Sequence, residues 1–183
     1  MTPPVRRILL ADADAFYVAV ARLVDPEGAG KAPLLIVGGT ASGRGVVTSA
    51  SYEARTYGVH SAMPTARALR LCPNATVVPV PMAACGEKGR EIKQALQQFT
   101  PAVEQASSDE FYLDMTGTER LYRDEPLESI ARRMRDQVGL TAKGAATSDK
   151  LRAALLTQGL DSAAIEAQVA KLEAKMIADR AAL

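Results

Sequence analysis

The chain contains the stretch ILLADADAFY, residues 8–17, in which a short apolar run ends in two carboxylates, Asp12 and Asp14. A second acidic cluster, SSDEFYLD at residues 107–114, lies beside another apolar run. Short apolar runs bounded in this way are typical of buried strands. Both acidic clusters are therefore predicted to lie at strand ends.

Carboxylates that crowd together at a strand end repel one another, and a divalent cation relieves that repulsion. Groups of Asp and Glu suit Mg²⁺, which completes its shell with water and substrate phosphates. Two such ions can clamp the attacking and leaving oxygens of a phosphoryl transfer. The alternative is that strand-end Asp residues serve turns and helix caps. Because there are two clusters, each beside an aromatic residue, we favour a metal site.

The charge balance of the chain bears on its partners. The 183 residues include 22 Lys and Arg against 21 Asp and Glu, a formal net charge of +1. A self-sufficient nucleic-acid binder more often has a clear basic excess or a basic stripe. The basic residues here are dispersed, with one modest cluster at Arg132, Arg133 and Arg135. Any grip on DNA is predicted to be local, weak or shared with another polypeptide.

The two cysteines, Cys72 and Cys85, have no zinc-site spacing, and His60 is the single histidine. They are predicted to be free, buried thiols. The start of the sequence lacks the pattern of a signal peptide, and no apolar stretch reaches the length of a membrane span. A soluble, cytoplasmic protein without a membrane partner is the expectation.

Hydrophobic periodicity and the positions of Gly and Pro divide the chain into short elements. Strands are predicted at residues 5–12, 34–37, 43–49, 75–80, 103–106 and 111–115, and helices at 15–24, 52–57, 64–71, 83–99 and 126–138. This order indicates an α+β fold, a sheet with helices on one face. After Gly139 the sequence becomes rich in Ala, and helices are predicted at 148–158 and 161–182.

The last predicted helix carries Ile165, Val169, Leu172 and Met176 at the spacing of a helix-packing seam. We expect this seam to pack back on the domain. Dimerisation, or docking of a protein partner through this helix, is the alternative.

Three stretches closely resemble the palm and fingers of Y-family DNA polymerases, the translesion enzymes of the DinB and UmuC type. They are ADADAFYVAV, GRGVVTSASYEARTYGVHSAMPTARALRLCPNATVVP and TPAVEQASSDEFYLDMTGTERLY, and the resemblance covers about residues 6–138. It implies an antiparallel, ferredoxin-like palm sheet from residues 1–14 and 79–146, with fingers from 15–78. Residues 147–183 would form a helical tail in place of a thumb and little finger.

The resemblance implies a DNA-directed DNA polymerase that acts in translesion synthesis and DNA repair. Its substrates would be dNTP and primer-template DNA, and its cofactor two Mg²⁺ ions, for which Mn²⁺ can substitute. Asp12, Asp109 and Glu110 match the catalytic carboxylates, which also bind the metal together with the backbone carbonyl of Ala13.

The same resemblance implies roles in nucleotide binding. Phe16 and Tyr17 match the pair beside the incoming sugar, with Tyr17 as the steric gate against a ribose 2′-OH. The triphosphate would be held by Ser49, Tyr52 and Arg55, with Lys150 matching a further phosphate-binding residue. Without the resemblance, Tyr52 would be read as core, Arg55 as a surface ion pair and Tyr17 as a packing aromatic.

The sequence also departs from the family. Ala21 stands where Glu is usual, the segment 139–150 is several residues short with Lys143 inside its apolar strand, and nothing after it resembles a thumb. These departures leave a second hypothesis, a non-catalytic palm and fingers module that binds nucleotide or a repair partner. A nucleotide cyclase-like activity is disfavoured, because no Gly-Gly-Asp-Glu-Phe turn is present.

Overall fold

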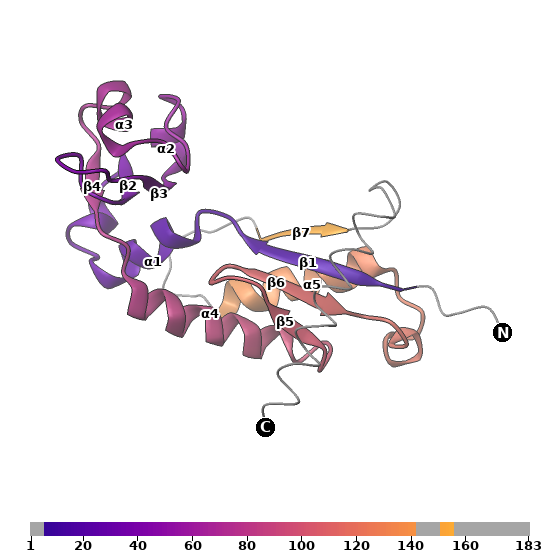
Figure 1. Cartoon of the computed structure of the whole chain (residues 1–183). Coiled ribbons are helices and arrows are strands. Elements are labelled where there is room, and N and C mark those ends of the chain that lie inside the picture. Colours follow the sequence, from indigo (N-terminus) through magenta and orange to yellow (C-terminus); the bar gives the residue numbers. More distant parts are fainter. Residues whose placement is uncertain (1–5, 142–150, 156–183) are drawn as a thin grey trace, which may run out of the picture.

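The computed structural model describes residues 6–141 and 151–155 (Figure 1). In chain order the strands are β1 (Ile8–Ala13), β2 (Leu35–Gly38), β3 (Val47–Ala50), β4 (Thr76–Val78), β5 (Val103–Gln105), β6 (Glu110–Asp114) and β7 (Leu151–Leu155). The helices are α1 (Phe16–Val24), α2 (Tyr52–Arg55), α3 (Thr65–Leu71), α4 (Met82–Leu96) and α5 (Leu127–Thr141), with short 3-10 helices η1 (Ala29–Lys31) and η2 (Glu119–Tyr122).

The strands form two separate sheets. The larger has the order β5-β6-β1-β7, and every neighbouring pair in it is antiparallel. The smaller has the order β3-β2-β4, with β2 antiparallel to β3 and parallel to β4. We call the larger sheet with α4 and α5 the palm unit, and the smaller sheet with α2 and α3 the fingers unit.

Strand β1 runs through the middle of the palm sheet, and its two faces differ. Leu9, Ala11 and Ala13 are buried, whereas the residues between them are only partly buried. Because successive side chains of a strand point to opposite faces, these three residues share one face. They pack in a single core with Phe111 and Leu113 of β6.

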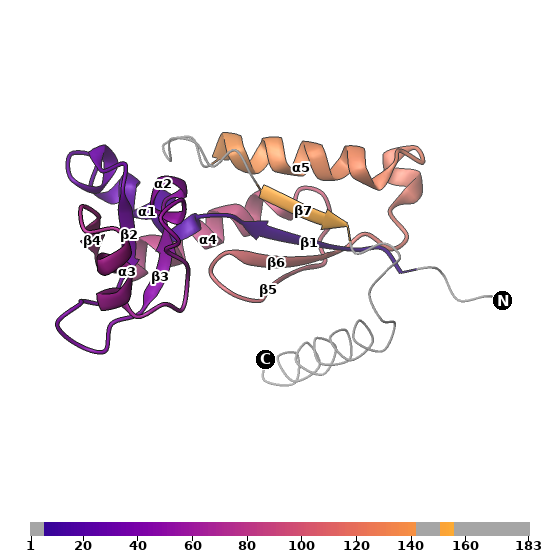
Figure 2. The same cartoon turned by 90° about the horizontal axis from the view of Figure 1, so that it is seen from above.

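Helices α4 and α5 cover that core-facing side of the palm sheet. Ile130, Met134 and Val138 of α5 follow one another at four-residue spacing and are buried, as expected for the apolar stripe of a surface helix. The two helices contact each other, and α5 also contacts β7. Seen from above, α5 runs alongside β1 and β7 (Figure 2).

The fingers unit has its own core around β2, in which all four residues are buried. Its core cluster joins residues from the sheet, α2, α3 and the loops between them: Ile36, Val47, Ala50, Ala54, Val59, Met63, Ala68 and Cys72. Ser51 caps the start of α2, because its hydroxyl accepts a hydrogen bond from the Ala54 N–H at 3.2 Å.

Helix α1 connects the two units and packs against both. Phe16 and Val20 belong to the palm core, whereas Val18 and Ala21 cluster with Leu35 and other fingers residues. Since α1 follows β1 directly, the end of the palm sheet lies next to the fingers (Figure 1).

The α+β class, the antiparallel palm sheet and the helices predicted between residues 15 and 138 are confirmed. Cys72 and Cys85 are free and buried, as predicted. Within the described residues, no helix combines the length and apolarity that crossing a membrane requires.

One expectation is wrong, the helix at residues 148–158. Residues 151–155 form β7 instead, paired antiparallel with β1, so this part of the predicted helical tail belongs to the palm sheet. The physical reason is non-local: β6 pairs with only one edge of β1, and the backbone groups of the other edge also need partners. Lys143, Lys150 and the helix predicted at 161–182 lie outside the described residues.

Candidate active site at the end of the palm sheet

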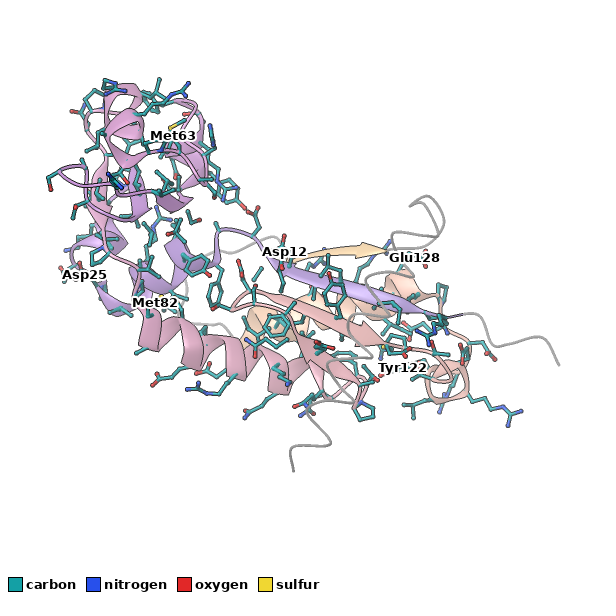
Figure 3. The ribbon with its side chains drawn as sticks, in the orientation of Figure 1. Asp12, Asp25, Met63, Met82, Tyr122 and Glu128 are labelled. Carbon is teal, nitrogen blue, oxygen red and sulfur yellow. The ribbon has the colours of Figure 1, made fainter. Side chains whose placement is uncertain are left out.

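Two of the three predicted carboxylates face each other across neighbouring strands. Asp12 of β1 and Glu110 of β6 are opposite one another in the antiparallel register. Directly opposed residues of such a pair point to the same face of the sheet. Asp12 and Glu110 therefore share the face opposite the core that α4 and α5 cover. Figure 3 labels Asp12 at the end of the sheet nearest the fingers unit. In the register on its other side, Asp12 is opposite Arg152.

Asp109 lies beside this pair, one residue before β6. The Ala13 N–H donates to the Asp109 carbonyl at 2.9 Å, which continues the β1–β6 pairing past Asp12. The turn is held by Ser107, whose hydroxyl donates to Asp109 Oδ1 at 2.7 Å and accepts from the N–H groups of Asp109 and Glu110 at 3.3 and 3.2 Å. The Ser107 hydroxyl therefore fixes both the Asp109 carboxylate and the backbone of the turn.

The three carboxylates do not converge into a metal cage. Among the described residues, no group of three or more His, Cys, Asp or Glu side chains is placed to hold a metal ion. Strand alternation explains this, because Glu110 shares a face with Asp12, whereas Asp109 directly precedes Glu110 and lies near the buried Cys85 of α4. The set contains only hard oxygen donors, which fit Mg²⁺, but Asp109 would have to leave Ser107 to join the other two.

The aromatic pair Phe16 and Tyr17 begins α1, directly after the acidic stretch. Phe16 is buried in the palm core, and the two rings meet edge to face with centroids 5.3 Å apart. Burial raises the pKa of Tyr17, and the nearby carboxylates of Asp109 and Glu110 raise it further, against an opposing interaction with Ser108. Tyr17 is thus a neutral, half-buried phenol beside the turn at residues 107–110, which we call the acidic turn.

A second cluster joins the end of the palm sheet to the fingers. Arg55 Nη1 donates to Asp14 Oδ1 at 3.1 Å, and the Tyr52 hydroxyl donates to Asp14 Oδ2. The Arg55 guanidinium also lies over the Tyr52 ring, 5.1 Å from its centroid. Partial burial raises the pKa of Asp14, but the hydrogen bonds from Tyr52 and Arg55 and the charge of Arg55 outweigh it, so that the pKa lies below its ordinary value.

The remaining predicted residues are placed as follows. Tyr52 is 41% exposed, which contradicts its reading as a core residue. Ser49 is buried in β3, opposite Val37 of β2. Its neighbour Ala50 provides the carbonyl that accepts from Arg55 Nε at 2.9 Å. The structure thus brings Tyr52 and Arg55 together, whereas Ser49 is buried within β3.

Three residues contribute to this arrangement through contacts that the sequence did not indicate. Asp14 lies within the first acidic cluster, but nothing in its spacing shows that it contacts residues about 40 positions away. Ser107 precedes Asp109 by two residues, a spacing at which a hydroxyl can cap a turn. Gly89 of α4 lies against the acidic turn. No local sequence pattern marks this glycine, because it matters only through the close approach of α4 to Ser108 in the folded chain.

Comparison of the sequence with known protein families agrees with this geometry. The model of the impB/mucB/samB family matches residues 11–158. The chain belongs to this family. The match includes both acidic clusters, the fingers unit and β7.

Curated relatives in the family carry the name DNA polymerase IV. The chain is 43% identical over 134 residues to the DNA polymerase IV of Brucella melitensis, which covers 72% of the chain and 29% of that protein. It is also 43% identical over 146 residues to the DNA polymerase IV of Desulfatibacillum aliphaticivorans, covering 79% of the chain and 36% of the relative. The chain therefore spans about a third of the length of these relatives.

Solved structures show the same fold. DinB from Sulfolobus solfataricus superimposes with a TM-score of 0.63 at 28% identity, covering 74% of this chain and 39% of DinB. An insertion ternary complex of Dbh DNA polymerase gives a TM-score of 0.62 at 30% identity, covering 74% of this chain and 40% of Dbh. The described units thus correspond to a part of these polymerases.

Proposed function

We propose that this chain is the palm and fingers part of a translesion DNA polymerase, which transfers nucleotidyl groups from dNTP to a DNA primer under the direction of a template. The observation that carries the proposal is the placement of two chemically different groups at one end of the palm sheet. Asp12, Asp109 and Glu110 supply carboxylates there, and Arg55 with Tyr52 supplies hydrogen-bond donors next to them. Membership of the impB/mucB/samB family supports the same activity.

The acidic residues are proposed to bind two Mg²⁺ ions through Asp12, Asp109, Glu110 and the Ala13 carbonyl, with Mn²⁺ as a substitute. Bound there, Mg²⁺ would neutralise triphosphate charge and lower the pKa of the primer hydroxyl. Rotation of Asp109 away from Ser107 is part of this proposal, because the Asp109 carboxylate accepts a hydrogen bond from the Ser107 hydroxyl.

The protein's own residues are proposed to bind and select the nucleotide. Arg55 offers a planar, permanently charged fork to phosphate oxygens, and Tyr52 adds a hydroxyl beside it. Tyr17 and Phe16 would lie against the sugar, where the Tyr17 ring excludes a 2′-OH by its bulk. Ser49 and Lys150 are proposed as further triphosphate ligands.

The proposed division of the chain assigns residues 1–14 and 79–146 to the palm and 15–78 to the fingers, with β7 added to the palm. Primer-template DNA is the proposed macromolecular partner. The pair Asp12 and Glu110 argues against a purely structural module, since like charges directly opposite one another on neighbouring strands are destabilising.

Calorimetry of dATP binding tests the proposal on the chain itself. Mg²⁺ should tighten dATP binding to the wild-type chain, and Asp109→Asn should weaken it by about tenfold or more, as expected for a charge-assisted metal contact. The matched control is Asp136→Asn, which neutralises an exposed carboxylate on α5 whose hydrogen bonds are to the adjacent Arg135.

Primer extension with Mg²⁺ or Mn²⁺ at low salt then separates the enzyme from a nucleotide-binding module. Extension that Asp109→Asn abolishes, while far-ultraviolet circular dichroism stays unchanged, is the expected result. The site assignment is wrong if dATP affinity responds neither to Mg²⁺ nor to Asp109→Asn.

A further inference from the structure

Asp14 has no place in the proposed catalytic set, yet its side chain bridges the β1–α1 turn and α2. It lies two residues after Asp12, in the turn between β1 and α1. Its partners Tyr52 and Arg55 are 38 and 41 residues further along the chain, in the fingers unit. Each carboxylate oxygen has its own donor: Oδ1 takes Arg55 and Oδ2 takes Tyr52.

These contacts fix the Arg55 side chain in one orientation. Nε donates to the Ala50 carbonyl at 2.9 Å, Nη1 donates to Asp14 at 3.1 Å, and the guanidinium lies over the Tyr52 ring. In the part of the chain that the structure describes, no hydrogen bond of Arg55 uses Nη2. The guanidinium is thus anchored on one side and keeps donors on the other.

Exposure shows which way this cluster faces. The Arg55 side chain is 36% exposed and that of Asp14 is 24% exposed. The carboxylate is therefore the more enclosed partner, and the guanidinium is the more accessible one. An anion that approaches from solvent meets the Arg55 donors more readily than the Asp14 charge.

We propose that Asp14 is a positioning residue, which holds Arg55 and Tyr52 in place for the triphosphate at a fixed offset from the acidic residue Asp12. The inference rests on the proposed function. Its physical basis is pre-organisation: a free arginine side chain loses rotamer freedom when it binds phosphate, and an arginine already anchored at Nε and Nη1 has less to lose.

The test compares Asp14→Ala, Asp14→Asn and the control Glu53→Gln. Glu53 is an exposed acid in α2 between the two donors in sequence, and it makes no contact with either in the hydrogen bonds and ion pairs of the described residues. Its substitution removes one negative charge, as Asp14→Asn does, but from the helix that carries Tyr52 and Arg55. Binding of Mg·dATP and of magnesium tripolyphosphate is measured by calorimetry with the full chain.

Asp14→Ala should weaken both ligands by about fivefold, the effect of losing one partly exposed charged contact. Asp14→Asn should recover part of the loss, because its amide oxygen still accepts from Arg55, and Glu53→Gln should not weaken binding. In an Arg55→Ala background, Asp14→Ala should change affinity less than about twofold, since it acts through Arg55. Tighter binding by Asp14→Ala, or an equal loss in both backgrounds, would overturn the inference.

A measurement without ligand separates this inference from the proposed function. Nitrogen-15 relaxation of the Arg55 Nε–Hε group should report a rigid side chain in the wild-type chain and a mobile one in Asp14→Ala. If Arg55 is equally rigid in both, the positioning role is wrong whatever the nucleotide data show. If the wild-type chain does not bind Mg·dATP, the proposed function fails instead.

Discussion

Tyr17 shows how much one residue depends on its neighbours at this site. It follows the buried Phe16, packs against both the palm core and the cluster that joins α1 to the fingers, and lies beside the acidic turn. Its phenol is kept neutral by burial and by nearby carboxylates. An aromatic ring held in this way can act by shape rather than by charge.

Tyr17→Ala is predicted to remove discrimination against a ribose. We expect the wild-type chain to bind Mg·dATP more tightly than Mg·ATP, and the ratio of the two affinities to fall by about tenfold in Tyr17→Ala, because a rigid pocket wall rejects an added hydroxyl. The control is Tyr17→Phe, which keeps the ring and should keep the ratio. An unchanged ratio in Tyr17→Ala, measured by calorimetry, would refute the steric role.

At the scale of the elements, the acidic turn depends on how closely α4 approaches it. A Cβ at Gly89 would lie 2.8 Å from the Ser108 carbonyl oxygen and 2.8 Å from Gln105 Nε2, closer than real Cβ atoms come to other atoms. Ser108 directly precedes Asp109. The absence of a side chain at Gly89 therefore sets where Asp109 and Glu110 lie relative to the palm core.

Gly89→Ala and Gly86→Ala form a matched pair for this contact. Both glycines lie inside α4, but a Cβ at Gly86 would meet only Arg90 Nη1, at 3.6 Å. Gly86→Ala should raise the free energy of unfolding by about 0.5–1 kcal/mol through helix propensity. Gly89→Ala should lower it by about 1–3 kcal/mol, the usual cost of overpacking, and should weaken Mg·dATP binding because it displaces the acidic turn.

Urea unfolding followed by circular dichroism, with calorimetry of dATP on the same samples, distinguishes the two variants. Equal stabilisation of both glycine variants, with nucleotide binding intact, would contradict this prediction. It would show that α4 and the acidic turn can move apart without a loss in the free energy of unfolding.

At the scale of the whole molecule, the charge is balanced and the chain matches about a third of its relatives' length. Phosphate contacts dominate the affinity of proteins for DNA. A chain with a formal net charge of +1 has few uncompensated cations for such contacts. The proposed nucleotide site therefore does not require a tight grip on duplex DNA.

Binding of primer-template DNA to the isolated chain is accordingly predicted to be weak, with a Kd in about the micromolar range or above at physiological salt. The logarithm of the binding constant should fall with the logarithm of salt concentration at a slope of about −2 to −4, which corresponds to only a few phosphate contacts. Fluorescence anisotropy over a salt series measures both quantities. Nanomolar affinity from these 183 residues would contradict the prediction.

Most of the fold could be predicted from the sequence because its signals are local. The apolar run at residues 8–11 and the alternation around Phe111 indicate strands whichever way the chain folds, and Pro and Gly residues mark where helices stop. Strand β7 could not be found in this way. Its Ala-rich sequence favours a helix locally, and it becomes a strand through pairing with the free edge of β1.

The chemical types at the site were determined by the sequence alone: carboxylates at two strand ends, an aromatic pair after the first, and Tyr52 with Arg55 on a short helix. Only the tertiary structure decided their relations. It placed Asp12 opposite Glu110, turned Asp109 toward Ser107, brought α4 against the acidic turn at Gly89, and joined Asp14 to Arg55. The identity of a residue is given by its own position in the sequence. A contact depends instead on strand register and on packing between segments far apart in the chain, and no local sequence pattern encodes these.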